Sequence, residues 1–88
     1  MKLVLCKECQ DVFKLASQKR NCECGKSSGR YLEDGLHATY HGPCVPIGFE
    51  NNSLRDAIIN QPKEGQGKCF TAFVIPKECD TMAKVALK

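Results

Sequence analysis

Four cysteines near the start of this chain have the spacing of ligands for a single metal ion. Cys6 and Cys9 enclose two residues, twelve residues follow, and Cys22 and Cys24 then enclose one residue before Gly25. Zn²⁺ binds four thiolates at about 2.3 Å in a tetrahedron, and a tight turn can aim two of them at one point. The pattern predicts one structural Zn²⁺ held by Cys6, Cys9, Cys22 and Cys24. Iron is the alternative metal, because a tetrahedral set of four cysteines accepts it as well.

A second group of ligand types lies at His37, His41 and Cys44. These residues could form another metal site, alone or with Cys69 or Cys79. On a strand, however, positions 37 and 41 lie roughly 13 Å apart, too far for one metal unless the chain bends. We therefore expect solvated or hydrogen-bonded histidines, and small core residues at positions 69 and 79. A nucleophilic pair of Cys44 with His41 has no recognisable orienting group, so we expect no enzymatic activity.

Hydroxyls and cations gather in the loop over residues 25–30. Such a loop can hold the phosphate of a small phosphorylated ligand or nucleotide. The candidate ligand-binding residues are Lys26, Ser27, Ser28, Arg30, Arg20 and Lys19. The spacing of a P-loop is absent, and an ordinary polar hairpin loop is the favoured interpretation. The basic residues of this half could instead form a rim for nucleic acid, since residues 1–30 carry seven basic and three acidic side chains.

The length and the cysteine content restrict the class of protein. A chain of 88 residues favours one domain over residues 1–88. It buries only roughly 60–65% of the surface of its unfolded form, so a metal would help to stabilise it. An odd count of seven cysteines and the absence of an apolar signal segment favour a reducing, cytoplasmic location. Because no apolar run approaches roughly 20 residues, we expect no membrane span.

Short alternating runs and turn signals predict a small β-rich α+β domain. We expect antiparallel strands over residues 3–5, 11–16, 30–32 and 37–40. Between residues 42 and 52, Pro43 and Pro46 interrupt an alternation of apolar side chains at Val45, Ile47 and Phe49. This stretch is typical of an edge strand or of an extended cover over the core.

The second half of the chain, residues 42–88, is expected to extend a metal-binding first half over residues 1–41. A short helix is predicted near residues 53–60, with Ser53 and Asp56 at its start and its apolar residues on one face. The run over residues 69–75 is rich in aromatic and β-branched residues, which favours a buried central strand. A short final helix is expected over residues 80–87.

Residues 6–41 resemble the zinc ribbon superfamily. The matching residues are Cys6, Cys9, Cys22 and Cys24, in the pattern Cys-x₂-Cys-x₁₂-Cys-x-Cys-Gly. The second pair departs from the regular Cys-x₂-Cys spacing. The stretch over residues 22–31 is also similar to small uncharacterised bacterial and phage proteins, which implies a microbial or phage source. The resemblance implies a ribbon of antiparallel strands and brings no activity with it, because such folds serve many functions.

These observations favour a non-enzymatic zinc-binding module. The formal net charge is +3, and four thiolates with one Zn²⁺ reduce it to +1, so bulk charge gives no reason to expect nucleic acid. Protein–protein interaction is therefore the first hypothesis, for instance as a phage or bacterial regulator or inhibitor of a larger complex. Nucleic-acid binding by the basic rim and capture of a small phosphorylated ligand are the alternatives. The sequence leaves the oligomeric state open.

Overall fold

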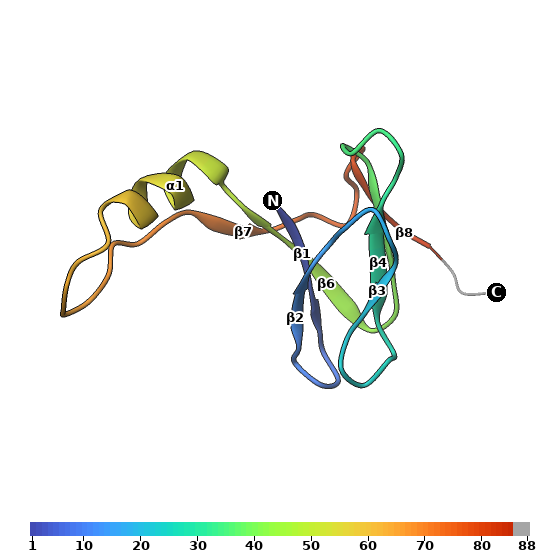
Figure 1. The fold of residues 1–88 in the computed structure, drawn as a ribbon. Coiled ribbons are helices and arrows are strands. Elements are labelled where there is room, and N and C mark those ends of the chain that lie inside the picture. Colours follow the sequence, from blue (N-terminus) through green and yellow to red (C-terminus); the bar gives the residue numbers. More distant parts are fainter. Residues whose placement is uncertain (86–88) are drawn as a thin grey trace.

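The computed structural model describes residues 1–85, which form two four-stranded sheets and one helix (Figure 1). The first sheet has the order β2-β1-β6-β7, with the bounds Val12–Lys14, Lys2–Cys6, Cys44–Phe49 and Ala72–Val74. The second has the order β3-β4-β5-β8, with the bounds Arg20–Asn21, Ser28–Tyr31, Ala38–His41 and Met82–Lys84. The helix α1 spans Asn51–Ile59. The predicted β-rich α+β class is confirmed.

The first sheet is built on the hairpin of β1 and β2. These strands pair antiparallel, with Leu3 opposite Lys14; Cys6 is the last residue of β1, and Cys9 lies in the loop that follows it. On its other side β1 pairs antiparallel with β6, with Cys6 opposite Cys44. Directly opposed residues lie on the same face of a sheet, so Cys44 is a neighbour of the first cysteine.

The second sheet places the other cysteine pair beside the first. The second pair lies in the loop that joins β3 and β4, which pair antiparallel. β4 continues into an antiparallel pair with β5. The chain then passes through the first sheet and returns as β8, which pairs parallel with β5 and sets Met82 opposite Ala38. Residues 42–85 are therefore interwoven with residues 1–41 in both sheets.

Buried side chains from both sheets form one core. Val4 from β1 and Met82 from β8 are almost inaccessible to solvent. Cys6, Cys22 and Cys44 belong to the same buried cluster. The two cysteine loops are therefore attached to the core and can position their side chains firmly.

Residues 50–74 form a projection that we call the arm. It contains α1 and β7 and extends away from the two sheets (Figure 1), which contributes to the elongated shape of 48 × 28 × 22 Å. None of the residues of α1 is buried. The helix is held by local contacts: the Glu50 side chain accepts hydrogen bonds from the Asn52 and Ser53 N–H groups, and Ser53 Oγ accepts one from the Thr71 N–H at 2.9 Å.

The prediction of a buried central strand over residues 69–75 is wrong. β7 covers only Ala72–Val74, and all three of its residues are exposed. It is an edge strand of the first sheet, paired on one side with β6. Because β7 lies in the arm, away from the strands other than β6 (Figure 1), its apolar side chains stay accessible to solvent: Phe73 is 50% exposed, and Cys69, expected in the core, is exposed as well. Of this run, Ile75 is buried.

The stretch around Pro46 also differs from its prediction, since β6 is an interior strand of its sheet. Its buried positions are Cys44, Pro46 and Gly48, whereas the alternating apolar residues between them are half-buried. The Ile75 N–H donates to the Pro46 carbonyl at 2.9 Å. Pro46 has no N–H to return, so the ladder between β6 and β7 ends at this point.

Both predicted helices differ from the structure. α1 begins at Asn51, two residues before the predicted start, because Glu50 caps it. The final helix predicted over residues 80–87 is wrong within the described residues, where Met82–Lys84 form β8; residues 86 and 87 lie outside them. The cause is pairing with β5, which residues 80–87 alone do not reveal. Among residues 1–85, α1 is too short and too polar to cross a membrane.

Candidate metal centre

Two loops of matching span carry the four cysteines. In the first loop the Cys6 N–H donates to the Asp11 carbonyl at 2.9 Å. In the second the Cys22 N–H donates to the Ser27 carbonyl at 2.9 Å. Both hydrogen bonds span five positions, so each loop begins with a cysteine and is closed in the same way. The two halves of the site are therefore local structures, set by hairpin turns.

The two loops turn differently, which explains their different cysteine spacing. In the first, the Gln10 N–H donates to the Cys6 carbonyl at 2.7 Å; in the second, the Gly25 N–H donates to the Cys22 carbonyl at 3.0 Å. The second turn is one residue tighter and therefore brings a cysteine into position after a single intervening residue. Each turn ends in a left-handed residue, with φ of 63° at Gln10 and 80° at Gly25. Glycine adopts this conformation without steric cost, whereas glutamine does not.

The four sulfur atoms lie within 4.8 Å of one another. Cys24 Sγ is 3.8 Å from Cys6 Sγ and 3.4 Å from Cys22 Sγ. Four thiolates bound tetrahedrally at about 2.3 Å from a central ion are roughly 3.8 Å from each other. The spacing of the sulfurs thus fits one metal ion, and the four cysteines gather where such an ion could bind.

Polar contacts hold the two loops together. The Glu23 N–H of the second loop donates to Asp11 Oδ2 of the first at 3.0 Å. Lys26 Nζ lies 3.3 Å from Glu8 Oε1 in an ion pair that links the same loops. Because both side chains of that pair are more than half exposed, its contribution to stability is small. The hydrogen bond from the Glu23 N–H to the Asp11 carboxylate is the second link between the same loops.

Ser27 provides polar groups to the sulfur atoms. Its N–H donates to Cys22 Sγ at 3.3 Å. Its hydroxyl is completely buried and has no hydrogen-bond partner among residues 1–85. A buried hydroxyl without a partner is costly. A thiolate at Cys6, whose pKa this hydroxyl lowers, would be a suitable acceptor, so the orphaned group fits a site in which the cysteines are deprotonated by a metal.

The sulfur atoms cannot all become thiolates at neutral pH without a cation. The Ser27 hydroxyl and the Cys9 N–H lower the pKa of Cys6 to about 6. The Lys26 N–H favours the thiolate of Cys24, but burial and the neighbouring sulfurs of Cys22, Cys9 and Cys6 outweigh it and raise the pKa of Cys24 to about 12. Accumulating negative charge opposes each further ionisation. A divalent cation removes this repulsion, which is the chemistry that four such cysteines support.

Cys44 lies beside the four clustered cysteines and is not part of their group. It faces Cys6 across the β1–β6 pair, and its Sγ donates to the His41 carbonyl at 3.4 Å. Burial raises the pKa of the Cys44 thiol. A buried, protonated thiol is a poor nucleophile. The His41 ring contacts the Val85 carbonyl through Nδ1 at 2.9 Å, so this nitrogen is already occupied.

A second metal site at His37, His41 and Cys44 is the less favoured interpretation of the sequence, and the one group of clustered ligand side chains among residues 1–85 is the four cysteines. His37 and His41 lie at opposite ends of β5. The His37 ring contacts Asp34. Hydrogen bonds from the His37 N–H and ring, and from the Leu36 N–H, lower the pKa of Asp34 to about 2. The two histidines therefore contact a loop residue and a backbone carbonyl near the end of β8. Cys69 and Cys79 form no ligand group with them.

The residues of the suggested phosphate-binding loop are not gathered in one exposed cradle. Ser27 and Ser28 are buried, so their hydroxyls do not face solvent. Lys26 is exposed and paired with Glu8. Arg30, Lys19 and Arg20 are exposed, and Arg20 Nη1 donates to the Lys14 carbonyl at 3.2 Å. Exposed cations therefore remain on this half, although the loop lacks the accessible hydroxyls that the prediction required.

The sequence did not indicate that a groove lies beside α1. Leu54 and Ile58 have the spacing of one helix face, and Arg55 and Ile59 lie next to them. The sequence predicted that the apolar residues share one face; in the structure Leu54 is half-buried and Ile58 is exposed.

Comparison of the chain with protein-family models, with curated proteins and with solved structures gave no match.

Proposed function

We propose that the protein is a structural zinc-binding module that acts by binding another protein and catalyses no reaction. The zinc-binding role is supported by the four cysteine sulfurs, which lie close together at distances that suit tetrahedral coordination of one ion. Zn²⁺ is favoured because it has no redox chemistry and suits a closed set of four thiolates. The two hairpin loops with their cysteines also agree with the resemblance to zinc ribbons.

A structural role is supported by the position of the site. Cys6 and Cys22 belong to the core cluster, and the four candidate ligands come from two separate turns with twelve residues between Cys9 and Cys22. An ion would cross-link the β1–β2 hairpin to the β3–β4 hairpin. Four protein ligands leave no open position for a substrate or a water molecule. In a chain of 88 residues such a link would contribute much of the folding free energy.

Protein binding is supported by the apolar surface of the arm. Ile58, Ile59, Phe73 and Val74 are between 50% and 73% exposed. Ile58 and Ile59 line one groove beside α1, and an exposed apolar surface of this kind is typical of interaction sites. The absence of activity is supported by Cys44, whose thiol is buried and bonded to a carbonyl oxygen.

Elemental analysis of protein purified without added metal tests the zinc proposal. We expect about one zinc per chain for a single site. Iron in its place would contradict the choice of metal, and a metal-free protein with a dispersed amide spectrum would contradict the structural role.

Affinity capture with the zinc-loaded protein tests the proposed binding activity. The zinc-loaded protein is immobilised and exposed to a bacterial lysate that has been treated with nuclease. Any retained protein is purified, and its binding to the zinc-loaded protein is measured by calorimetric titration. A stoichiometric complex that persists at high salt is the expected result. Retention of nucleic acid alone, lost as salt is raised, would favour the basic residues of the first half and contradict protein binding.

A further inference from the structure

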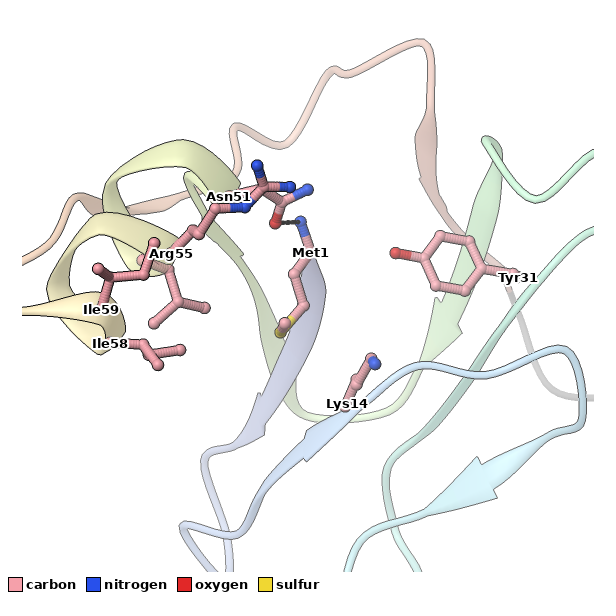
Figure 2. Close-up of a pocket in the computed structure, with 8 residues that line it drawn as sticks. Met1, Lys14, Tyr31, Asn51, Arg55, Ile58 and Ile59 are labelled. Carbon is pink, nitrogen blue, oxygen red and sulfur yellow. Dashed lines mark hydrogen bonds between the residues drawn. The ribbon is translucent and has the colours of Figure 1, made fainter.

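A groove with a volume of about 520 Å³ lies where α1 approaches the start of β1 (Figure 2). Its walls are α1 on one side and Lys14 and Tyr31, from β2 and β4, on the other. The Met1 side chain lies between these walls. The groove therefore joins the arm to the body of the protein and includes residues from both sheets.

The groove presents apolar side chains to solvent. Its apolar lining consists of Met1, Leu54, Ile58 and Ile59. Ile58 is 63% exposed and Ile59 is 73% exposed. A helix of nine residues gains little stability alone, and the packing of an apolar face normally stabilises it. In this helix that face is turned to an accessible groove.

The charges that line the groove have one sign. Lys14 and Arg55 are its charged residues, and no carboxylate lines it. Among residues 1–85 neither side chain forms an ion pair, whereas Lys68, elsewhere on the arm, is paired with Asp56. Figure 2 shows Lys14 and Arg55 on either side of the Met1 side chain. The hydrogen bond from Arg20 to the Lys14 carbonyl adds a third cation near this wall.

We propose that this groove binds an acidic segment of a partner protein. Apolar side chains of the segment pack on Ile58 and Ile59, and its carboxylates pair with Lys14 and Arg55. Charge complementarity selects an acidic segment because the groove offers two unpaired cations and no acid. The exposure of the isoleucines favours a peptide over a small molecule, since small-molecule sites enclose most of their ligand. This inference rests on the proposed protein-binding function and names its site and the chemistry of the partner.

A displayed library of random linear peptides, selected on the zinc-loaded protein, tests the proposal. We expect enriched peptides with Asp or Glu close to Leu, Ile or Phe. The change Arg55→Glu should weaken their binding about tenfold or more, and Ile58→Ser should weaken it as well. Lys63→Glu is the matched control, because it changes an exposed lysine of the arm outside the groove lining. Metal content and amide spectra show whether each variant is folded.

A charge swap makes the test specific. The double variant Lys14→Glu with Arg55→Glu should bind peptides in which Lys replaces the acidic residues, and should reject the original ones. Enriched peptides that bind Arg55→Glu and Ile58→Ser as well as wild type would overturn the groove and leave the protein-binding proposal in place. Enrichment of basic peptides, or no enrichment, would overturn the inference. Groove-dependent binding of an oligothymidine would do the same and would favour nucleic acid.

Discussion

Gly42→Ala should destabilise the protein by about 2–5 kcal/mol, because this glycine meets two separate steric demands. Its φ is +107°, a conformation that residues with a side chain rarely adopt. A Cβ atom at this position would lie 2.1 Å from the Lys26 carbonyl oxygen and 2.8 Å from Ser27 Cα. Both are backbone atoms, which cannot rotate away as a side chain does.

The magnitude follows from the two contributions. A left-handed residue with a Cβ costs about 1–2 kcal/mol. Forcing an extra carbon into a packed position costs about 1–3 kcal/mol more. A protein of this length has a total stability of about 4–13 kcal/mol, so the loss is a large fraction of it. The melting temperature should fall by about 10–30 °C.

Two other glycines separate the contributions. Gly35 also has a positive φ, +68°, but a Cβ there would meet no atom within 4 Å, so Gly35→Ala should cost about 1–2 kcal/mol. At Gly67 a Cβ would have free space and φ lies outside the left-handed range, so alanine should be neutral or slightly stabilising.

Denaturant unfolding of the zinc-loaded variants gives the free energies, and competition with a chelator gives the metal affinity. The Gly42→Ala variant should also bind metal more weakly, because the contact moves Lys26 and Ser27, which follow Cys24. Equal losses of stability for Gly42→Ala and Gly35→Ala would refute the steric contribution and with it the close approach of β5 and the second cysteine loop.

Three further perturbations test the site and the arm. Ser27→Ala should lower the metal affinity about 10- to 100-fold in chelator competition, because the buried hydroxyl supports the Cys6 thiolate. The exposed control Ser17→Ala should leave the affinity unchanged. Equal affinities of the two variants would mean that the Ser27 hydroxyl does not act on the metal. Cys9→Ser should remove the metal and the cooperative unfolding transition together, since three thiolates hold zinc poorly, and a folded, metal-free variant would contradict a structural role. Hydrogen bonds from the Asn52 and Ser53 N–H groups lower the pKa of Glu50 below its usual 4.5, so the stabilisation of α1 should be complete above pH 4.5 and lost as the pH falls through the folded pKa. Amide shifts of residues 51–54 followed against pH measure this, and unchanged shifts down to pH 2 would exclude the cap.

The features that local sequence determines were predictable. The cysteine spacing predicted that the four sulfurs cluster where a metal could bind, because each pair belongs to a single tight turn. The strands β1, β2 and β5 were also predicted, since alternation and turn residues act over a few positions. The start of α1 was misplaced because Ser53 with Asp56 resembles a cap, whereas the Glu50 carboxylate, three residues earlier, accepts the first N–H groups.

Features set by distant parts of the chain could not be predicted in this way. β8 is a strand because β5, about forty residues earlier, offers it an edge. Whether residues 69–75 are buried depends on how far β6 extends beyond the second sheet. The amino-acid composition of these residues does not reveal this. Gly48 is an example: a Cβ there would lie 2.5 Å from the Phe73 ring, so the glycine provides the space in which Phe73 of the arm packs on β6.

The apolar run in β7 and the apolar face of α1 therefore have the composition of core elements and the position of surface elements. Tertiary packing within residues 1–85 covers them only in part: α1 has no buried residue, and every residue of β7 is exposed. Exposed apolar residues lower solubility and favour aggregation unless another surface covers them. Beyond the pairing of β7 with β6, the arm is held by a carboxylate cap, a serine hydroxyl and one exposed ion pair, which are weak contacts. Such an element opens more easily than the core, so we expect its amides to exchange faster than those of β1 and β4, and to become protected when the acidic segment binds in the groove.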